Sequence, residues 1–83
     1  MQDELVTIYT QPLCAYCKQA KEYFDKKGLG YKEIDITSDA DAYHWINQNV
    51  GFVATPIIDI GGEIIVGYDI PAIDGALVDH DII

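Results

Sequence analysis

The sequence predicts an α/β domain in which helices cover both faces of a mixed four-stranded sheet. The apolar residues repeat with strand and helix periods in the order β-α-β-α-β-β-α, which is typical of such a layered fold. A glycine pair separates the last two strand-like segments and indicates a hairpin. The chain has 83 residues, 49% of them hydrophobic, which suffices for one small core. We therefore expect residues 1–83 to form one domain.

The first strand and helix have clear signals. Residues 5–10 are rich in β-branched and aromatic side chains and stop before Pro12, as a buried strand does. A helix is predicted over residues 15–27, and Gly28 suits a left-handed C-terminal cap. The apolar stripe of this helix consists of Tyr16, Ala20, Tyr23 and Phe24.

A second strand is predicted over residues 31–36, because apolar and polar residues alternate there. The intervening helix makes the first two strands a parallel pair. A second helix follows, with Ser38 as the predicted N-cap and an end near Val50. Its predicted apolar side consists of Ala42, Tyr43, Ile46 and Val50. This arrangement leaves His44 and Gln48 toward water.

The last three elements are a hairpin and a helix. Residues 56–60 and 63–66 are short strand-like runs on either side of Gly61-Gly62, a turn typical of hairpins. Asp69 is a suitable cap for the final helix, which tolerates Pro71 in its first turn. The apolar face of that helix consists of Ile70, Ile73, Ala76 and Leu77.

The charge distribution argues against nucleic-acid binding. Fourteen acids and five bases give a net charge of -9, and from Glu33 to the end there are ten acids and no base. Phosphate backbones are bound by Lys and Arg spread over the whole contact surface. The bases are Lys18, Lys21, Lys26, Lys27 and Lys32, which predicts a mildly positive patch on the first helix and second strand. We expect protein partners rich in Lys and Arg, with association that slows as salt rises.

The sequence also bears on location. The first four residues are acidic and polar, whereas a signal peptide opens with positive charge followed by an apolar run. No apolar stretch approaches the roughly 20 residues of a membrane helix. We therefore expect a cytoplasmic protein with no membrane partner.

Two cysteines, Cys14 and Cys17, lie where the first helix begins. A disulfide that encloses two residues removes little unfolded-state entropy, which argues against a purely structural bond. A Cys-x-x-Cys pair beside a βαβ pattern predicts a thioredoxin-fold redox site. The alternatives are an inert buried pair and half of a zinc site. The candidate zinc ligands His44 and His80 lack metal-ligand spacing, so we expect no metal and read both as surface residues.

Position on the helix assigns roles to the two thiols. Cys14 at the helix N-terminus is the predicted nucleophile, because free backbone N–H groups and the helix dipole stabilise a thiolate there. Cys17 lies one turn on and is the predicted resolving thiol. Lys18 and Lys21 follow within a turn, where they either support the thiolate or form a solvated helix face.

Three motifs give the chain a resemblance to a known family. They are Tyr9-Thr10-x-x-x-Cys14-x-Tyr16-Cys17, Thr55-Pro56 before the hairpin, and Gly67-Tyr68-Asp69 at the head of the last helix. In order and spacing this set resembles the glutaredoxins across essentially the whole chain. The resemblance implies the minimal thioredoxin fold and reduction of protein disulfides and glutathione mixed disulfides. Glutathione is then a co-substrate, and no cofactor is permanently bound.

The resemblance also implies a glutathione site. Tyr16 forms part of its wall, and the backbone of Thr55 pairs with the tripeptide like an added strand. Gly67, Tyr68 and Asp69 form a helix N-terminus that receives the γ-glutamyl carboxylate, although capping and packing alone also explain the last two.

General statistics and the family resemblance give different expectations for the conformation of the Thr55–Pro56 peptide bond. Sequence alone favours a trans bond, because only about 5–6% of X–Pro bonds are cis. The family resemblance implies a cis Pro56 that faces the cysteines.

Departures from the family pattern leave alternatives open. Ala15 stands where the family commonly has proline, and Gln11 stands where many members have lysine. Many members also have a basic residue or Gln near the position of Phe52. Gly51-Phe52 and the single Gly67 also resemble redoxins that are reduced by thioredoxin reductase and donate electrons to ribonucleotide reductase. A third possibility, permitted by Ala15, is a dimer that bridges a [2Fe–2S] cluster. We expect a monomer with disulfide-bearing protein substrates, ribonucleotide reductase among them.

Overall fold

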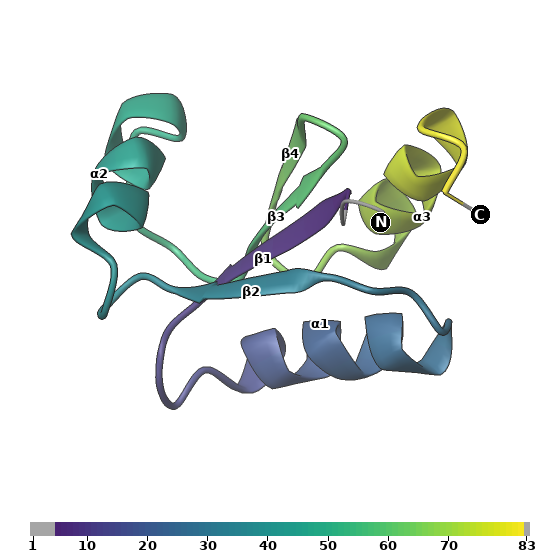
Figure 1. Cartoon of the computed structure of the whole chain (residues 1–83), viewed down its shortest axis with the longest axis horizontal. Coiled ribbons are helices and arrows are strands. Elements are labelled where there is room, and N and C mark those ends of the chain that lie inside the picture. Colours follow the sequence, from purple (N-terminus) through teal and green to yellow (C-terminus); the bar gives the residue numbers. More distant parts are fainter. Residues whose placement is uncertain (1–4, 83) are drawn as a thin grey trace.

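The computed structural model describes residues 5–82 and contains the element order that the sequence predicts (Figure 1). The elements are β1 (Val6–Thr10), α1 (Ala15–Lys26), β2 (Lys32–Asp35), α2 (Ala40–Asn49), β3 (Ile57–Ile60), β4 (Glu63–Val66) and α3 (Ile70–Asp79). The predicted α/β fold with a mixed sheet is confirmed.

The four strands form one sheet in the order β2-β1-β3-β4. β1 and β2 run parallel, with Tyr9 opposite Ile34, as expected when a helix connects them. β3 lies antiparallel to β1 and is joined to β4 by a tight turn. Gly61 and Gly62 of that turn have φ angles of 59° and 100°, which glycine adopts without steric cost. The predicted hairpin is therefore confirmed.

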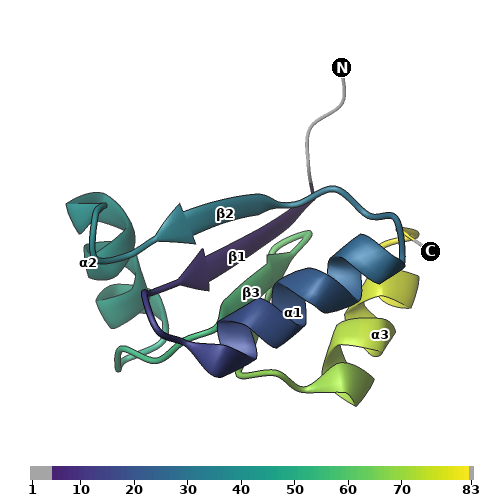
Figure 2. The ribbon, with the colours of Figure 1, turned by 90° about the horizontal axis from the view of Figure 1, so that it is seen from below.

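Helices cover both faces of the sheet. α1 and α3 lie side by side on one face, and α2 covers the other (Figures 1 and 2). The alternation of β1 explains this arrangement: Ile8 packs in the cluster with α1 and α3, whereas Tyr9 points to the opposite face. There the Tyr9 ring stacks on Trp45 of α2 at a centroid distance of 5.2 Å.

The larger core cluster lies between the sheet and the helix pair. Phe24 of α1 is its largest fully buried side chain and contacts Tyr23 and Tyr31 edge-on or tilted. Truncation of a buried phenylalanine costs about 3–5 kcal/mol, so Phe24 contributes strongly to the packing of α1 on the sheet.

Several local predictions are wrong in detail. The N-cap of α2 is Asp39, whose carboxylate accepts from the Ala42 N–H at 3.0 Å, and not Ser38. The Ser38 N–H is instead used in a turn, bonded to the Asp35 carbonyl. Asp and Ser are comparable caps, so the local turn that follows β2 decides between them.

Two tyrosines predicted on apolar helix faces are exposed. Tyr16 is 60% exposed because it lies in the first turn of α1, away from the core cluster. Tyr43 is 47% exposed, because α2 packs on the sheet through Ala42 and Ile46. The second strand is also shorter than predicted, at Lys32–Asp35.

The prediction that both histidines are exposed is right for one of them, and the predicted C-terminal cap of α1 is present. His44 is exposed, as predicted, whereas His80 is half-buried and lies 3.4 Å from the Glu63 carboxylate. Gly28 follows α1 with φ 71°, which confirms the left-handed cap. Within residues 5–82, no helix combines the length and apolar character needed to cross a membrane.

Candidate active site

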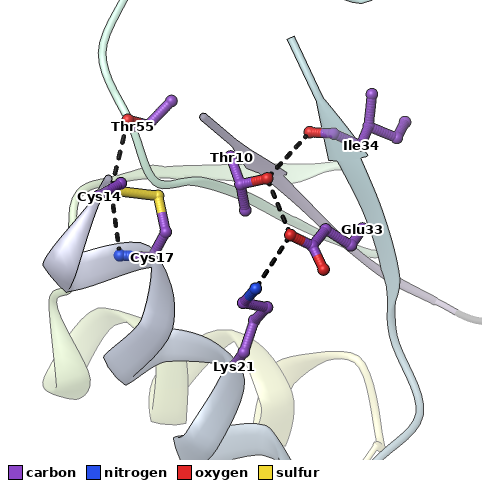
Figure 3. Close-up of a disulfide and its surroundings, with 7 residues drawn as sticks. All are labelled: Thr10, Cys14, Cys17, Lys21, Glu33, Ile34 and Thr55. Carbon is purple, nitrogen blue, oxygen red and sulfur yellow. Dashed lines mark hydrogen bonds and ion pairs between the residues drawn. A yellow bond between two sulfur atoms is a disulfide. The ribbon is translucent and has the colours of Figure 1, made fainter. Parts of the chain in front are cut away.

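The two cysteines form a disulfide at the N-terminus of α1 (Figure 3). Cys14 is the N-cap of this helix, and its Sγ accepts the Cys17 N–H at 3.1 Å. The backbone of Cys14 is extended, and its carbonyl accepts the first helical hydrogen bond, from Lys18, at 3.2 Å. Cys14 therefore occupies the position where the helix N–H groups stabilise negative charge.

The two sulfurs differ in accessibility. Cys14 is partly exposed, whereas Cys17 is only 2% exposed and lies on the sheet-facing side of α1. Their Cα atoms are 5.2 Å apart, one helical turn. An incoming disulfide reaches Cys14 first, and Cys17 reaches only a group already bonded to Cys14.

The loop before β3 lies against the disulfide. The Thr55 hydroxyl is 3.5 Å from Cys14 Sγ, and the Thr55–Pro56 peptide bond is cis. The cis bond corrects the expectation from sequence alone and agrees with the one drawn from the family resemblance. The Gly67 N–H donates to the Pro56 carbonyl at 2.8 Å, which joins the end of β4 to this loop. Gly67 has φ 90°, a conformation that favours glycine.

Aromatic side chains connect α1 to the start of α3. The Tyr16 and Tyr68 rings stack at 6.5 Å, and Tyr68 meets Tyr23 edge-on at 6.3 Å. The Tyr23 hydroxyl donates to Asp74 of α3. Burial, followed by this hydrogen bond, raises the pKa of Tyr23 to about 12. The ring contacts place Tyr16 of α1 beside Tyr68 at the start of α3.

Asp69 caps α3 as predicted. One of its carboxylate oxygens accepts the Ala72 N–H at 3.2 Å, and the residue is exposed. Through the bond between Gly67 and Pro56, the start of α3 is tied to the same loop that touches Cys14. Two helix N-termini thus converge on one end of the sheet.

A cavity of about 670 Å³ lies beside the disulfide, between α1 and β2. Cys14, Cys17 and both predicted lysines line it, together with Gln11. A polar network that the sequence did not predict forms part of its wall (Figure 3): the Thr10 hydroxyl and the Lys21 ammonium each lie 3.0 Å from one Glu33 carboxylate oxygen.

The network changes the expected charge pattern. Lys21 is paired with Glu33, and Lys27 lies 3.9 Å from the Asp74 carboxylate. Lys18 has no ion pair among residues 5–82. Of the two lysines that line the cavity beside the thiols, Lys18 is therefore the one without an ion pair among residues 5–82, and Lys21 no longer contributes a free charge.

Sequence reasoning missed two residues of this region, Leu13 and Glu33. Leu13 has a positive φ of 62°, which the identity of the residue does not predict. Glu33 reaches the site through the parallel pairing of β1 and β2. Among the described residues, 5–82, no group of three or more His, Cys, Asp or Glu has the arrangement of a metal site.

The fold and the site together define a class of protein. A Cys-x-x-Cys disulfide at a helix N-terminus, next to a cis-proline loop in a thioredoxin-like fold, is the site of a thiol–disulfide oxidoreductase.

Comparison with known proteins identifies the family within this class. The family model for glutaredoxin matches residues 6–65, and the chain belongs to the glutaredoxin family. An uncharacterized glutaredoxin-like 8.6 kDa protein in the rubredoxin operon of Clostridium pasteurianum is 30% identical over 70 residues, 84% of this chain and 93% of that protein. The glutaredoxin of Neisseria meningitidis serogroup B is 33% identical over 66 residues, 78% of each chain.

Solved structures agree with this assignment. The thioredoxin-like protein BC3987 is 30% identical and superposes with a TM-score of 0.80, over 87% of this chain and 99% of that one. A buckwheat glutaredoxin–glutathione complex is 28% identical, with a TM-score of 0.74 over 92% of this chain and 74% of that one.

Proposed function

We propose that this protein is a glutathione-dependent reductase of protein disulfides and glutathione mixed disulfides. The observation that carries the proposal is the placement of Cys14 Sγ. It lies 3.1 Å from the Cys17 N–H and 3.5 Å from the Thr55 hydroxyl, at the partly exposed end of α1. Both groups are suited to stabilise a thiolate on Cys14 once the disulfide is reduced.

Reduction of a substrate proceeds in two displacements. The Cys14 thiolate attacks one sulfur of the substrate disulfide, forms a mixed disulfide, and releases the other sulfur as a thiolate that takes a proton from water. Cys17 then loses its proton and attacks Cys14 Sγ. The Cys14–substrate bond breaks, the second substrate thiol leaves, and the Cys14–Cys17 disulfide remains.

Glutathione restores the dithiol. One glutathione thiolate attacks the Cys14–Cys17 disulfide at Cys14, which leaves Cys17 as a thiol and Cys14 bonded to glutathione. A second glutathione attacks the glutathione sulfur of that bond. The products are glutathione disulfide and the Cys14 thiolate, so the electrons balance over the cycle.

The proposed glutathione site lies between the two converging helix N-termini. The backbone of Thr55 next to Pro56 supplies strand-like hydrogen bonds to the tripeptide. The stacked rings of Tyr16 and Tyr68 form one wall. The backbone N–H groups at the start of α3, by Gly67 and Asp69, receive the γ-glutamyl carboxylate. Lys18 and Gln11 support the site from the cavity side.

A coupled assay tests this proposal. The protein and a disulfide substrate are supplied either with glutathione and glutathione reductase or with thioredoxin reductase, and NADPH oxidation is followed. We expect turnover in the first system. Turnover only in the second would overturn the proposal.

A substitution separates the two steps. Cys17→Ser abolishes reduction of protein disulfides and spares reduction of glutathione mixed disulfides, because the latter needs only Cys14. Retained activity in Cys14→Ser would overturn the assignment of the nucleophile.

A redoxin fed by thioredoxin reductase is the second candidate. Its support is the absence of a cation at two places: Gln11 is uncharged, and Phe52 is 55% exposed beside the loop that leads to Thr55. An exposed aromatic favours a protein partner over the glycyl carboxylate of glutathione. The coupled assay distinguishes the two candidates directly.

A further inference from the structure

The resolving thiol, Cys17, requires a group that takes its proton. The thiolate and not the thiol attacks Cys14 Sγ in the second displacement. Cys17 is only 2% exposed, and burial disfavours the charged form of a side chain. The buried thiol therefore keeps its proton until a base that shares its surroundings accepts it.

The cavity beside the disulfide limits the candidates for this base. Cys17 lines the cavity of about 670 Å³, which is large enough to hold water. Besides the two cysteines, its titratable lining residues are Lys18, Lys21, Glu33 and Asp35. A charged lysine donates protons and has no lone pair to accept one. Hydrogen bonds from the Thr37 hydroxyl and N–H lower the pKa of Asp35, which makes it a poor acceptor. Glu33 is the carboxylate that remains.

The Glu33 carboxylate is held on the side of the sheet where Cys17 lies. Glu33 is paired with Ile8, the β1 residue that packs in the cluster with α1. The Thr10 hydroxyl and the Lys21 ammonium both donate to Glu33 Oε2, each at 3.0 Å (Figure 3). Lys21 lies four residues after Cys17 and so shares its face of α1. The second oxygen, Oε1, accepts no hydrogen bond from residues 5–82 and is available to a proton.

We propose that Glu33 accepts the proton of Cys17 when the mixed disulfide on Cys14 is resolved. The proton passes through the cavity to Oε1, and the Cys17 thiolate attacks Cys14 Sγ. The bond between Cys14 and the substrate sulfur breaks, and the substrate leaves as a thiolate that takes a proton from water. Glu33, whose side chain is 40% exposed, then releases its proton to solvent. Thr10 and Lys21 are positioning residues, because they act through the carboxylate that they hold.

The other charges around Glu33 stay fixed near neutral pH. Lys18 and Lys21 face it from α1, Asp35 lies two residues further along β2, and β1 adds no titratable group to the cavity. Tyr31, just before β2, stays neutral because burial raises the pKa of its phenol. Carboxylates are ionised and lysines are charged between about pH 5 and 8. A pH dependence of the resolution rate in this range therefore reports on the group that takes the proton from Cys17.

A stopped-flow reaction separates the two displacements on which this proposal rests. The full chain is reduced, freed of reductant and mixed with excess dithiobis(nitrobenzoate), a disulfide whose halves leave as coloured thiolates. The first thiolate reports attack by Cys14, at a rate that rises with reagent concentration. The second reports attack by Cys17 on the mixed disulfide, at a rate independent of the reagent. We expect the second rate of the wild-type chain to change less than about twofold between about pH 5.5 and 7.5, because the carboxylate is ionised throughout.

Variants identify the proton acceptor. Glu33→Gln keeps an oxygen for the Thr10 hydroxyl, leaves the first phase unchanged and slows the second about tenfold at neutral pH. Its second rate then rises about tenfold per pH unit, because hydroxide takes the proton instead. Lys21→Met slows the second phase about threefold, since the carboxylate is no longer held, and Lys21→Arg restores it. Glu22→Gln is the matched control and changes neither phase, because Glu22 is an exposed carboxylate of α1 that lines a different cavity.

Each other outcome contradicts the proposal. An unchanged second phase in Glu33→Gln means that Glu33 takes no proton, and a faster one means that its charge only repels the Cys17 thiolate. Equal slowing of both phases, or slowing with the pH dependence of the wild type, assigns Glu33 a structural role. If Glu33→Gln does not fold, the loss in Lys21→Met and its rescue in Lys21→Arg decide. A wild-type chain without a first phase contradicts the exchange chemistry at Cys14 itself, so the two failures are distinguishable.

Discussion

The three helices begin with the same hydrogen bond made by different atoms. Cys14 of α1, Asp39 of α2 and Asp69 of α3 each cap their helix by accepting the backbone N–H three residues on, at 3.1, 3.0 and 3.2 Å. Two of the caps are carboxylates and one is sulfur. The α1 terminus has therefore exchanged an ordinary stabilising cap for a reactive one at the same position.

The exchange explains why the site lies at α1. A carboxylate cap is charged at neutral pH whatever the redox state, and it serves the stability of the helix. A sulfur cap becomes charged only after reduction, and the N–H groups that it caps then stabilise the reactive form. The α1 and α3 termini converge near the Thr55–Pro56 loop, whereas α2 lies on the other face of the sheet.

The largest expected effect comes from converting the α1 cap into the kind that α2 and α3 use. Cys14→Asp abolishes all measurable disulfide reduction, because the nucleophile is lost. The variant retains a good cap, so it is about 1 kcal/mol more stable than Cys14→Ala. Urea unfolding of both variants measures this difference. Equal stabilities would mean that the cap position contributes nothing to α1.

The next effect separates the two carboxylate caps. Asp39→Ala and Asp69→Ala each cost about 1 kcal/mol of unfolding free energy, from loss of the cap. Only Asp69→Ala also raises the KM for glutathione, because α3 begins at the proposed tripeptide site and α2 does not. Asp69→Asn, which still caps, keeps the stability. A raised glutathione KM in Asp39→Ala would contradict the distinction between the two termini.

The smallest effect tests the hydrogen bond between Tyr23 and Asp74, which connects α1 to α3. The pKa of Tyr23 is raised to about 12 by burial and by its hydrogen bond to Asp74, so the folded chain favours the neutral phenol. The resulting stability is fully present below about pH 10, the ordinary tyrosine pKa, and is lost as pH rises through about 12. Wild type should lose more stability between these values than Tyr23→Phe, in urea midpoints measured at both ends. Parallel losses in the two proteins would contradict this role.

Periodicity and turn chemistry predicted most of the fold. The strand alternation of β1 and the Gly61-Gly62 turn are local signals that the tertiary structure does not override. Ser38 and Asp39 are equally good caps by sequence, so the choice of Asp39 depends on the turn after β2. Tyr16 belongs to the predicted apolar stripe of α1 and yet is exposed, since helical spacing gives the face of a side chain and not whether another element packs on it.

Site residues that belong to a local sequence motif were predictable, whereas residues that strand pairing brings to the site were not. Cys14 and Cys17 are recognised from spacing alone. Glu33 enters the site because β1 and β2 pair in one particular register, which places its carboxylate by the Thr10 hydroxyl. The left-handed Leu13 has no sequence signal, since leucine has no preference for that conformation.

The central claim is that the sulfur cap of α1 is the nucleophile. The most direct test treats the reduced wild-type chain with a limiting amount of iodoacetamide at about pH 6 and locates the label by peptide mass spectrometry. Since the helix N-terminus stabilises the Cys14 thiolate and Cys17 is buried, essentially all label should be on Cys14. Label on Cys17, or none on either cysteine until the pH of an ordinary thiol is reached, would contradict the account.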